Sequence, residues 1–535
     1  VEPAMRVFIN EAVCEGCGDC GEKSSCLSVQ PIETEFGRKT AIHQSSCNKD
    51  YTCLDGDCPA FIEVIPAGKT PKKSTLEVTN VDNNLPEPNR IEEGNVLMMG
   101  IGGTGVVTIN QLLATAALLD GKESHGLDQT GLAQKGGPVV SNLKIRWAGA
   151  EGEVEEANKI GSGEADAYIV FDLLTGTSAV NLEKAMPGKT IALVSSSKVP
   201  TGAMVRDTSA KYPEWSTLRA TIDSATVPEK NIYFDAGRLS DALFRSHMPA
   251  NIIVLGSAYQ SGVIPISASA IEKAIELNGV SIDNNTQAFR IGRKIVLDST
   301  FLDSLNLGDK DAKRMQNKNS ATAEKMIKEV QDPSEELQRL LSIRTPELID
   351  YQNVGYAQTY IDFVSKVRKQ EISIGSDTRM SETVARYLFK LMAYKDEYEV
   401  ARLHRSGDFH QAIKDQFGDK TKVTYKLHPP SMKRLGLDKK IGLGKSGDMA
   451  FAVLTKMKFL RGKGIDPFGN TRHRKLERAL IPEYMETIDS CLERLSSDNY
   501  ENAVEIAALP DMIRGYEEIK EANVERYREA VQNLL

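Results

Sequence analysis

Cysteine crowding at one end of the chain constrains its fold more than any other feature. Seven of the eight cysteines lie within the first 58 residues of a 535-residue chain. Cys14, Cys17 and Cys20 are spaced two residues apart, and Cys58 is followed directly by Pro59. A triplet of this kind, completed by a distant cysteine before a proline, is a ligand pattern of iron–sulfur clusters. The pattern predicts one complete four-thiolate site, formed by Cys14, Cys17, Cys20 and Cys58.

The other three N-terminal cysteines, Cys26, Cys47 and Cys53, are one ligand short of a second four-thiolate site. They leave two alternatives open: a site completed by a non-cysteine ligand, or a three-iron cluster. Three residues are candidates for the missing ligand: Asp50, Asp57 and His43. We therefore predict one 4Fe-4S cluster and regard a second cluster as an open alternative.

Zinc and disulfides are the competing interpretations of the cysteines. Structural zinc sites usually pair two CxxC-like knuckles, which the triplet exceeds, so a zinc-stabilised interaction module is the weaker alternative. Disulfides require an oxidising compartment, and an odd number of N-terminal cysteines prevents full pairing. No signal segment precedes the cysteines, so we expect reduced thiols and a cytoplasmic protein. Cys491, in a helical stretch, is expected to be an ordinary thiol.

Changes in composition divide the chain into five segments. Residues 1–65 are too short and loop-rich for a sizeable apolar core, so a metal cluster would have to stabilise them. Residues 66–94 are polar and proline-containing, as linkers are. Residues 95–300 alternate apolar strands with amphipathic helices, which predicts an open α/β sheet. A charged helical connector (301–345) and a mostly helical domain (346–535) follow, and no internal repeat is evident.

Periodicity predicts the individual elements. The chain starts with a strand-like segment at 6–9. In the α/β segment we expect strands at 96–99, 167–171, 190–195, 232–234 and 252–255, and helices at 106–119, 179–186 and 240–246. Further helices are expected at 321–341, 356–367, 381–394, 449–459, 476–495 and 516–535. No apolar run approaches the ~20 residues of a membrane span, so we expect no membrane contact.

A glycine loop joins the predicted strand 96–99 to the helix 106–119; its glycines are Gly100, Gly102, Gly103 and Gly105. Backbone amides at such a helix start can hold a phosphate. A dinucleotide site also needs an acid after a second strand, whereas Asp120 and Glu123 follow the helix with no predicted strand between. The open alternatives are a packing turn, NAD or FAD, and another phosphate such as that of coenzyme A.

Two further segments suggest binding. The stretch 126–141 contains Lys135, Gly136 and Gly137, which indicates either a backbone that approaches a ligand closely or a surface loop. The stretch 420–478 is rich in Lys and Arg, although the net charge of the chain is −8. Their positive electrostatic field could steer an acidic ferredoxin or coenzyme A phosphates; the alternative is a solvated face or an intersubunit contact. It lacks a nucleic-acid recognition motif, so we expect no nucleic-acid partner.

Several of these segments together resemble the indolepyruvate ferredoxin oxidoreductase family, within the 2-oxoacid:ferredoxin oxidoreductases. They are residues 13–20, 45–50, 100–105, 135–138, 392–401 and 466–469. The resemblance covers essentially the whole chain and implies a ferredoxin-like module, a Rossmann-like gamma domain and the C-terminal domain of the long fused members. The sequence departs from many gamma domains at Ala133 and Lys135, where those have Glu and Arg.

The resemblance implies a function as well as a fold. It implies oxidative decarboxylation of an aryl 2-oxoacid such as indolepyruvate, with coenzyme A as acyl acceptor and electrons leaving through 4Fe-4S clusters to ferredoxin. The thiamine motif (Gly-Asp-Gly, then Asn) is absent, so thiamine diphosphate and Mg²⁺ are expected on partner domains or subunits of an obligate oligomer. The alternative is a non-catalytic iron–sulfur electron carrier with a docking domain.

Overall fold

The computed structural model describes residues 3–55, 58–67, 81, 84–131, 136–148, 157–305, 307, 317–375, 377–427 and 441–535. Contacts divide the chain into two compact units. We call residues 72–310 the α/β unit, and residues 1–71 together with 311–535 the cysteine unit. The sequence analysis assigned residues 1–65 and 346–535 to separate domains, whereas their contacts group them in one unit.

The α/β unit is built on a six-stranded sheet with the order β10-β9-β8-β5-β7-β6. The strands are β5 (Gly94–Ile101), β6 (Lys122–Thr130), β7 (Pro138–Trp147), β8 (Ala167–Val170), β9 (Ile191–Ser195) and β10 (Ile232–Phe234). The ladders from β10 through β9 and β8 to β5 are parallel, and β7 pairs antiparallel with both β5 and β6. This arrangement confirms the predicted open α/β sheet.

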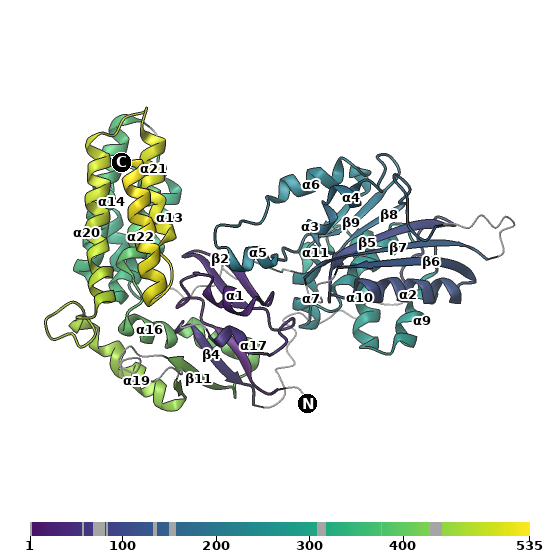
Figure 1. Ribbon diagram of the computed structural model, residues 1–535, viewed down its shortest axis with the longest axis horizontal. Coiled ribbons are helices and arrows are strands. Elements are labelled where there is room, and N and C mark those ends of the chain that lie inside the picture. The colour runs from purple at the N-terminus through teal and green to yellow at the C-terminus, as the bar shows by residue number, and fades with distance from the viewer. Residues whose placement is uncertain are drawn as a thin grey trace. The chain divides into compact units, whose positions relative to one another are not determined.

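Helices cover both faces of this sheet, because its strands are apolar on both sides. Val96 and Met98 pack into one core with the first group of helices, and Leu97 and Met99 into the opposite core. The first group is α2 (Val106–Leu119), α7 (Ala236–Phe244), α8 (Ala250–Gln260), α9 (Ala268–Asn278) and α10 (Ile282–Leu297). The second is α3 (Leu173–Gly176), α4 (Ala179–Leu182) and α6 (Trp215–Asp223). Figure 1 shows the two groups on opposite sides of the sheet.

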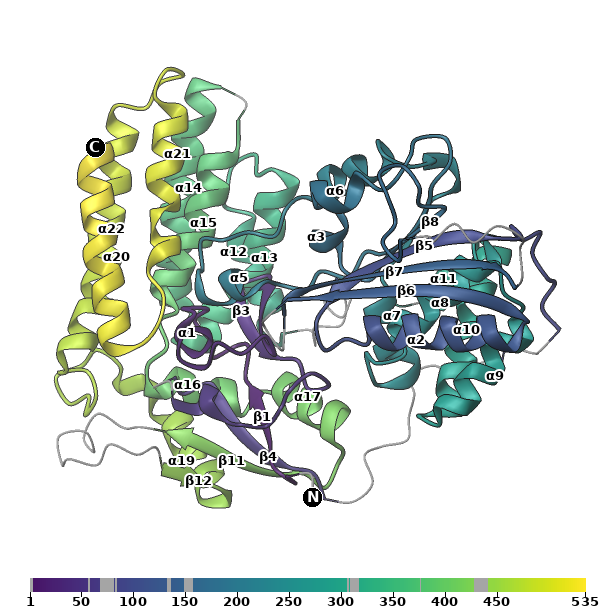
Figure 2. The same ribbon diagram turned by 45° about the vertical axis from the view of Figure 1, so that its right-hand side comes forward.

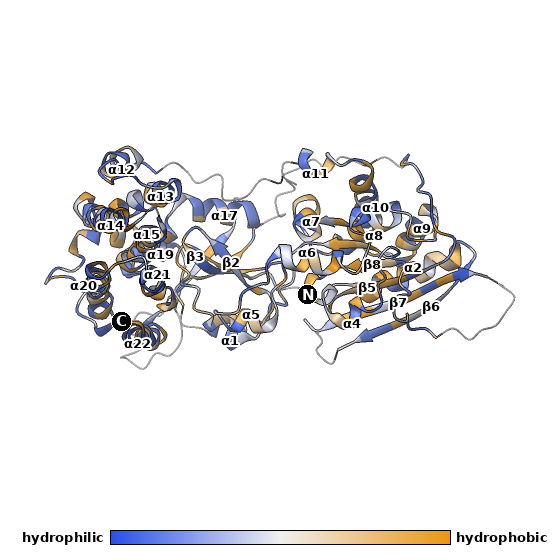
Figure 3. Cartoon of the chain, turned by 90° about the horizontal axis from the view of Figure 1, so that it is seen from above, coloured by the Kyte–Doolittle hydropathy of each residue, from blue (hydrophilic) through white to orange (hydrophobic). Residues whose placement is uncertain are grey.

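One prediction for this unit is wrong. Residues 252–255, expected to form a strand, lie inside α8, which is buried almost throughout. A short, fully apolar run does not distinguish a buried strand from a buried helix. In the stretch 126–141, residues 126–130 belong to β6 and residues 138–141 to β7, and the two strands pair antiparallel. In Figure 3 the exposed edge strand β6 is mostly blue, in contrast to the orange of the buried elements.

The N-terminal part of the cysteine unit contains the same pattern twice. A strand, a cysteine-containing loop, a helical turn and a second strand occur first as β1 (Arg6–Ile9), α1 (Asp19–Ser24) and β2 (Val29–Thr34). They occur again as β3 (Gly37–Ile42), η1 (Thr52–Asp55) and β4 (Phe61–Ile65). The outer strands β1 and β4 pair antiparallel, as do the inner strands β2 and β3. This internal repeat corrects the sequence analysis, which found none.

The repeat is joined to the C-terminal part by a shared sheet. β4 also pairs antiparallel with β11 (Lys422–Leu427), giving the order β1-β4-β11-β12, where β12 is Ile441–Leu443. Ile62 and Val64 of β4 pack into one core with Phe409 and Tyr425. That core also involves α16 (Glu397–His404), α17 (Gly407–Phe417) and α19 (Lys445–Lys456). Strands more than 350 residues apart in sequence therefore form one layer.

The rest of the cysteine unit is a bundle with one apolar core. Its helices are α12 (Ser320–Ile327), α13 (Glu335–Tyr351), α14 (Val354–Ile374), α15 (Arg379–Met392), α20 (Arg472–Glu493), α21 (Tyr500–Ala508) and α22 (Glu517–Leu534). Figure 2 shows the long helices running side by side. The predicted helix 321–341 is in fact two helices, because Pro333 disfavours helical continuation. None of the helices in the described ranges has the length and apolarity that crossing a membrane requires.

Candidate iron–sulfur site and glycine loops

The four cysteines of the predicted complete set share one location. Cys14 and Cys17 lie in the loop between β1 and α1, Cys20 is the second residue of α1, and Cys58 lies just before β4. Burial raises the pKa of Cys58 well above its usual value, and the neighbouring thiols Cys14, Cys17 and Cys20 raise it further. Charges that act on one another in this way are close in space. The structure thus brings together residues from both halves of the repeat.

The surroundings of these thiols suit metal-bound thiolates. Burial raises the pKa of Cys17 to about 11 and that of Cys20 still further. Backbone amides oppose this effect: Gly16 N–H donates to Cys14 Sγ at 3.3 Å, and the Asp19 amide donates to Cys17. Amide donors favour the charged form of sulfur, and binding to iron releases the thiol protons. Four soft sulfur donors, two of them buried and two half-buried, are the set that an iron–sulfur cluster uses.

The incomplete set forms a second group. After burial, the charges of Cys47 and Cys26 are the main causes that raise the pKa of Cys53, to about 12, and Cys26 also raises that of Cys47. Cys53 in turn raises the pKa of Cys20, so the two groups are neighbours. Each of the eight cysteines in the chain is a free thiol. In the described part of the chain, no three His, Cys, Asp or Glu side chains converge as ligands of a single metal ion.

The three candidates for the missing ligand differ in their surroundings. Asp50 lies close enough to Cys47 and Cys53 to raise the pKa of both thiols. The His43 ring nitrogens lie 2.8 Å from Ser46 Oγ and 3.3 Å from Ser45 Oγ. Asp57 lies outside the described residues.

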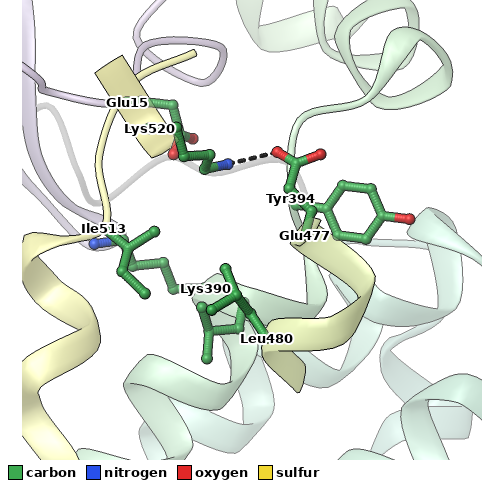
Figure 4. A pocket seen from close by; sticks show the side chains of 8 residues that line it. Glu15, Lys390, Tyr394, Glu477, Leu480, Ile513 and Lys520 are labelled. Atoms are coloured by element: carbon green, nitrogen blue, oxygen red, sulfur yellow. Dashed lines mark hydrogen bonds and ion pairs between the residues drawn. The ribbon is translucent and has the colours of Figure 1, made fainter. Parts of the chain in front are cut away.

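A buried group of charges lies beside the first cysteine set, and the sequence analysis missed it. Lys39 Nζ donates to the Cys14 carbonyl at 2.6 Å, and Lys520 Nζ donates to Glu477 Oε1 at 2.7 Å. Figure 4 shows Lys520 and Glu477 with Glu15 around a cavity of about 10 Å³, room for roughly one water. Burial raises the pKa of Glu15, but Lys520 and Lys39 offset this and leave it below its usual value. These residues are far apart in sequence, so no local sequence pattern predicts that they form a cluster.

A buried histidine connects the cysteine loops to α16. Asn10 Nδ2 lies 3.1 Å from His404 Nδ1, and His404 Nε2 lies 3.0 Å from the carbonyl of Pro59, the residue after Cys58. Asn10 also donates to the Leu403 carbonyl. An amide donor at Nδ1 makes Nε2 the protonated nitrogen. Burial lowers the pKa of His404 to about 4, so the ring is neutral at pH 7.

The two glycine segments of the α/β unit meet. Gly102 N–H donates to the Gly137 carbonyl at 2.7 Å, and Gly136 N–H donates to the Gly102 carbonyl at 3.4 Å. Lys135 lies outside the described residues. A Cβ atom at Gly100 would lie 2.8 Å from Val106 Cγ2, which supports the packing role at that position. Gly105, before α2, has a φ of +95°, and no atom of the described residues lies within 4 Å of a Cβ placed on it. Gly103 also has a positive φ.

This glycine loop lies where ligands bind in open α/β sheets. It follows the carboxyl end of β5, where the chain order reverses between β5 and β8. Asp120 is engaged elsewhere, because its carboxylate accepts the Ser267 N–H and Oγ–H at the start of α9. The strand β6 begins at Lys122, so neither Asp120 nor Glu123 stands after a second strand, and β7 separates β6 from β5. The dinucleotide interpretation therefore has no support from Asp120.

Polar residues at the same edge of the sheet were missed. Ser197 Oγ donates to Asp235 Oδ1 at 2.5 Å and lies 2.9 Å from Ser195 Oγ, at the ends of β9 and β10.

Part of the basic stretch 420–478 lies inside the cysteine unit. Arg461 pairs with Asp396 and Arg474 with Glu477, each largely buried.

Comparison with known proteins extends the picture. Residues 95–295 match the family "Pyruvate ferredoxin/flavodoxin oxidoreductase", and residues 337–533 match a family of unknown function, DUF6537. Indolepyruvate oxidoreductase subunit IorB of Archaeoglobus fulgidus is 26% identical over 200 residues, which are 37% of this chain and 92% of that protein. The subunit IorB of Pyrococcus horikoshii is 23% identical over 206 residues, 38% of this chain and 96% of that protein.

Among solved structures, the pyruvate oxidoreductase subunit PORC of Thermotoga maritima aligns at 22% identity with a TM-score of 0.28, over 38% of this chain and 97% of that one. The gamma subunit of a keto/oxoacid ferredoxin oxidoreductase from Geobacter sulfurreducens aligns at 19% identity with a TM-score of 0.26, over 38% and 98%. The sequence matches confirm the resemblance to 2-oxoacid:ferredoxin oxidoreductases, and they support an oxidoreductase subunit.

Proposed function

We propose that this chain is the electron-transfer and assembly part of an indolepyruvate-type 2-oxoacid:ferredoxin oxidoreductase. The complete enzyme oxidatively decarboxylates an aryl 2-oxoacid to an acyl-coenzyme A, and the electrons leave through 4Fe-4S clusters to ferredoxin. The catalytic thiamine diphosphate and Mg²⁺ belong to partner domains or subunits, because the chain has no thiamine motif. We place the assembly in the cytoplasm, where thiols stay reduced.

One observation carries this proposal. A single chain combines a domain of the pyruvate ferredoxin/flavodoxin oxidoreductase family with seven N-terminal thiols gathered into two neighbouring groups. Iron–sulfur clusters transfer single electrons, which is the chemistry that a 2-oxoacid oxidation needs downstream of thiamine. Cys14, Cys17, Cys20 and Cys58 would hold the first cluster, and Cys26, Cys47 and Cys53 the second.

Protein groups of this chain would bind and orient rather than perform acid–base catalysis. The joined glycine segments offer backbone amides at the carboxyl edge of the sheet, a suitable environment for a phosphate of coenzyme A. The amides of Gly16 and Asp19 donate to the sulfurs of Cys14 and Cys17, and such donors stabilise metal-bound thiolates. Lys39 adds a positive charge beside Cys14, which favours an electron-rich cluster.

The test is anaerobic purification followed by metal and sulfide analysis and an electron-transfer assay. Iron with equal sulfide is expected, together with reduction of a viologen dye when the thiamine-binding partner, indolepyruvate and coenzyme A are supplied. Cys17→Ser should abolish dye reduction, whereas Cys491→Ser should leave it unchanged because Cys491 lies in α20.

The possible outcomes separate the alternatives. Iron and sulfide without dye reduction, under any 2-oxoacid, would leave a non-catalytic electron carrier. Zinc in place of iron in an anaerobic preparation would indicate an interaction module and end the redox proposal. Reduction with pyruvate but not with indolepyruvate would refute the aryl substrate and keep the rest.

A further inference from the structure

The internal repeat aligns each predicted ligand of one loop with a residue of the other. Cys47, Asp50 and Cys53 have the same mutual spacing as Cys14, Cys17 and Cys20. In each loop the third of these residues lies at the second position of a helical turn, α1 in the first loop and η1 in the second. Asp50 therefore occupies the position of the middle cysteine.

The backbone around Asp50 repeats the backbone around Cys17. The residues flanking Cys17, Gly16 and Gly18, have φ angles of +62° and +85°. The residues flanking Asp50, Lys49 and Tyr51, have φ angles of +62° and +64°. Glycine adopts this left-handed conformation at no cost, but Lys and Tyr do so only under constraint. Such strain is commonly retained where a site requires it.

Hydrogen bonds repeat as well. The amide two residues after the first ligand donates to its sulfur in both loops: Gly16 N–H to Cys14, and Lys49 N–H to Cys47. The amide two residues after the middle position also donates to it in both loops. The Asp19 amide donates to the Cys17 sulfur, and Thr52 N–H donates to Asp50 Oδ1 at 3.2 Å. The Asp50 carboxylate thus matches the Cys17 sulfur in sequence position, in the φ angles of its neighbours and in its amide donor.

The other candidates have no such counterpart. The alignment sets His43 opposite Asn10, which is not a ligand in the first loop and bonds to His404. It sets Asp57 opposite Ser24, whose Oγ donates to the Cys20 carbonyl. The position of the missing cysteine is matched only by Asp50 among these three.

We propose that Asp50 is the fourth ligand of the second group, which with Cys26, Cys47 and Cys53 holds a four-iron cluster carrying one carboxylate-bound iron. This inference rests on the iron–sulfur centres of the proposed function. Asn48 Nδ2 donates to Asp50 Oδ2 at 3.0 Å and Thr52 Oγ1 donates to Oδ1 at 3.1 Å, and these bonds orient the carboxylate.

A carboxylate oxygen is a harder donor than a thiolate and suits iron–sulfur chemistry less well. Asp50 is also exposed, so its iron is open to solvent. We therefore expect a reversible loss of this one iron. On mild oxidation one electron passes to the oxidant, one Fe²⁺ leaves, and a three-iron cluster stays on the three cysteines. Fe²⁺ and a reductant reverse the step.

The test uses the full chain, prepared anaerobically with both centres and about eight irons. Ferricyanide should remove one iron per chain and produce the electron paramagnetic resonance signal of an oxidised three-iron cluster, at about one spin per chain. Incubation with Fe²⁺ and dithionite, followed by removal of unbound iron, should restore the lost iron to each chain. Asp50→Cys should retain the iron and show no three-iron signal, and Asp50→Ala should show the signal as prepared and take up no iron in that incubation.

Asp57→Ala and His43→Ala are the matched controls and should behave as the unaltered chain. The inference is overturned if both Asp50 variants behave as the unaltered chain, or if Asp57→Ala or His43→Ala gives the result expected for Asp50→Ala. A permanent three-iron cluster in the unaltered chain also overturns it. Each of these outcomes leaves the first cluster and the proposed function intact, whereas an iron-free protein would end the proposed function itself.

Discussion

His404 shows how one buried residue makes stability depend on pH. Its folded pKa of about 4 lies below the ordinary 6.5, because burial disfavours the charged ring. Between these values the unfolded chain binds a proton that the folded chain does not. The free energy of unfolding should therefore be unaffected above pH 6.5 and fall as the pH drops towards 4, by up to about 3 kcal/mol. Urea unfolding of the cysteine unit at pH 7 and pH 5 measures this.

A variant comparison isolates the histidine from the carboxylates that titrate in the same range. His404→Gln should reduce the difference in stability between pH 7 and pH 5, although it destabilises the protein at both. His410→Gln is the control, because His410 is exposed on the neighbouring helix α17. Equal pH dependence in all three proteins would show that His404 is not the titrating group.

Arg461 is a second residue whose effect can be predicted. Its guanidinium donates to Asp396 Oδ2 at 2.5 Å and Oδ1 at 2.9 Å and lies 3.6 Å from the centre of the Tyr351 ring. Arg461→Met should lower the free energy of unfolding by about 3–5 kcal/mol, because it leaves the Asp396 carboxylate buried without its partner. Chemical denaturation measures the loss. Lys463→Met, at an exposed neighbour, should change it by less than about 0.5 kcal/mol.

A residue of the candidate site could be predicted from the sequence only where a contiguous sequence pattern marks it. The ligand set around Cys14 follows from spacing alone, since a cluster-binding loop is a contiguous stretch. Lys39, Lys520 and His404 have no such signal, because tertiary packing alone brings them to the cysteines. Asp50 was one of three open candidates, since the φ angles of Lys49 and Tyr51 that distinguish it cannot be read from residue names.

At the level of elements, the contact between α8 and α10 depends on two glycines. A Cβ atom on Gly256 would lie 2.0 Å from the Phe289 carbonyl oxygen, and one on Gly292 would lie 2.0 Å from that of Ile253. Backbone atoms cannot rotate away as side chains do. Gly256→Ala should therefore destabilise the α/β unit by about 1–3 kcal/mol, despite a gain of about 1 kcal/mol in helix propensity.

Thermal or chemical unfolding of the α/β unit checks this, with Gly131→Ala as the control. A Cβ atom at Gly131 would lie 3.8 Å from the Pro138 carbonyl oxygen, which is an ordinary contact. Unchanged stability of Gly256→Ala would mean that the two helices can separate at little cost.

Some elements could be predicted from the sequence and others could not. The helix 106–119 and the strands 167–171, 190–195 and 232–234 were predicted correctly, because each has the length and the flanking residues that are typical of its type. The run 252–255 was read as a strand because α8 is buried on all sides, so polar residues do not mark a helical period. The repeat of β1–α1–β2 was hidden because its second copy replaces a cysteine and two glycines.

At the scale of the whole molecule, the cysteine unit is assembled from both ends of the chain. β4 receives hydrogen bonds from β1 on one side and β11 on the other, and Glu35 of the β2–β3 turn pairs with Arg339 and Arg344 of α13. The segment 1–71 thus lacks a complete core without residues 311–535. The α/β unit instead keeps both of its cores within residues 72–310.

This organisation predicts how fragments of the chain behave. Residues 72–310 alone should unfold in one cooperative transition, because all six strands and both covering layers are present. Residues 1–71 alone should show none, because β4 loses its pairing with β11 and the apolar face formed by Ile62 and Val64 loses its cover. Residues 1–71 joined by a long Gly/Ser linker to 311–535 should regain the transition. Circular dichroism during heating measures all three, and a cooperative transition in 1–71 alone would refute the prediction.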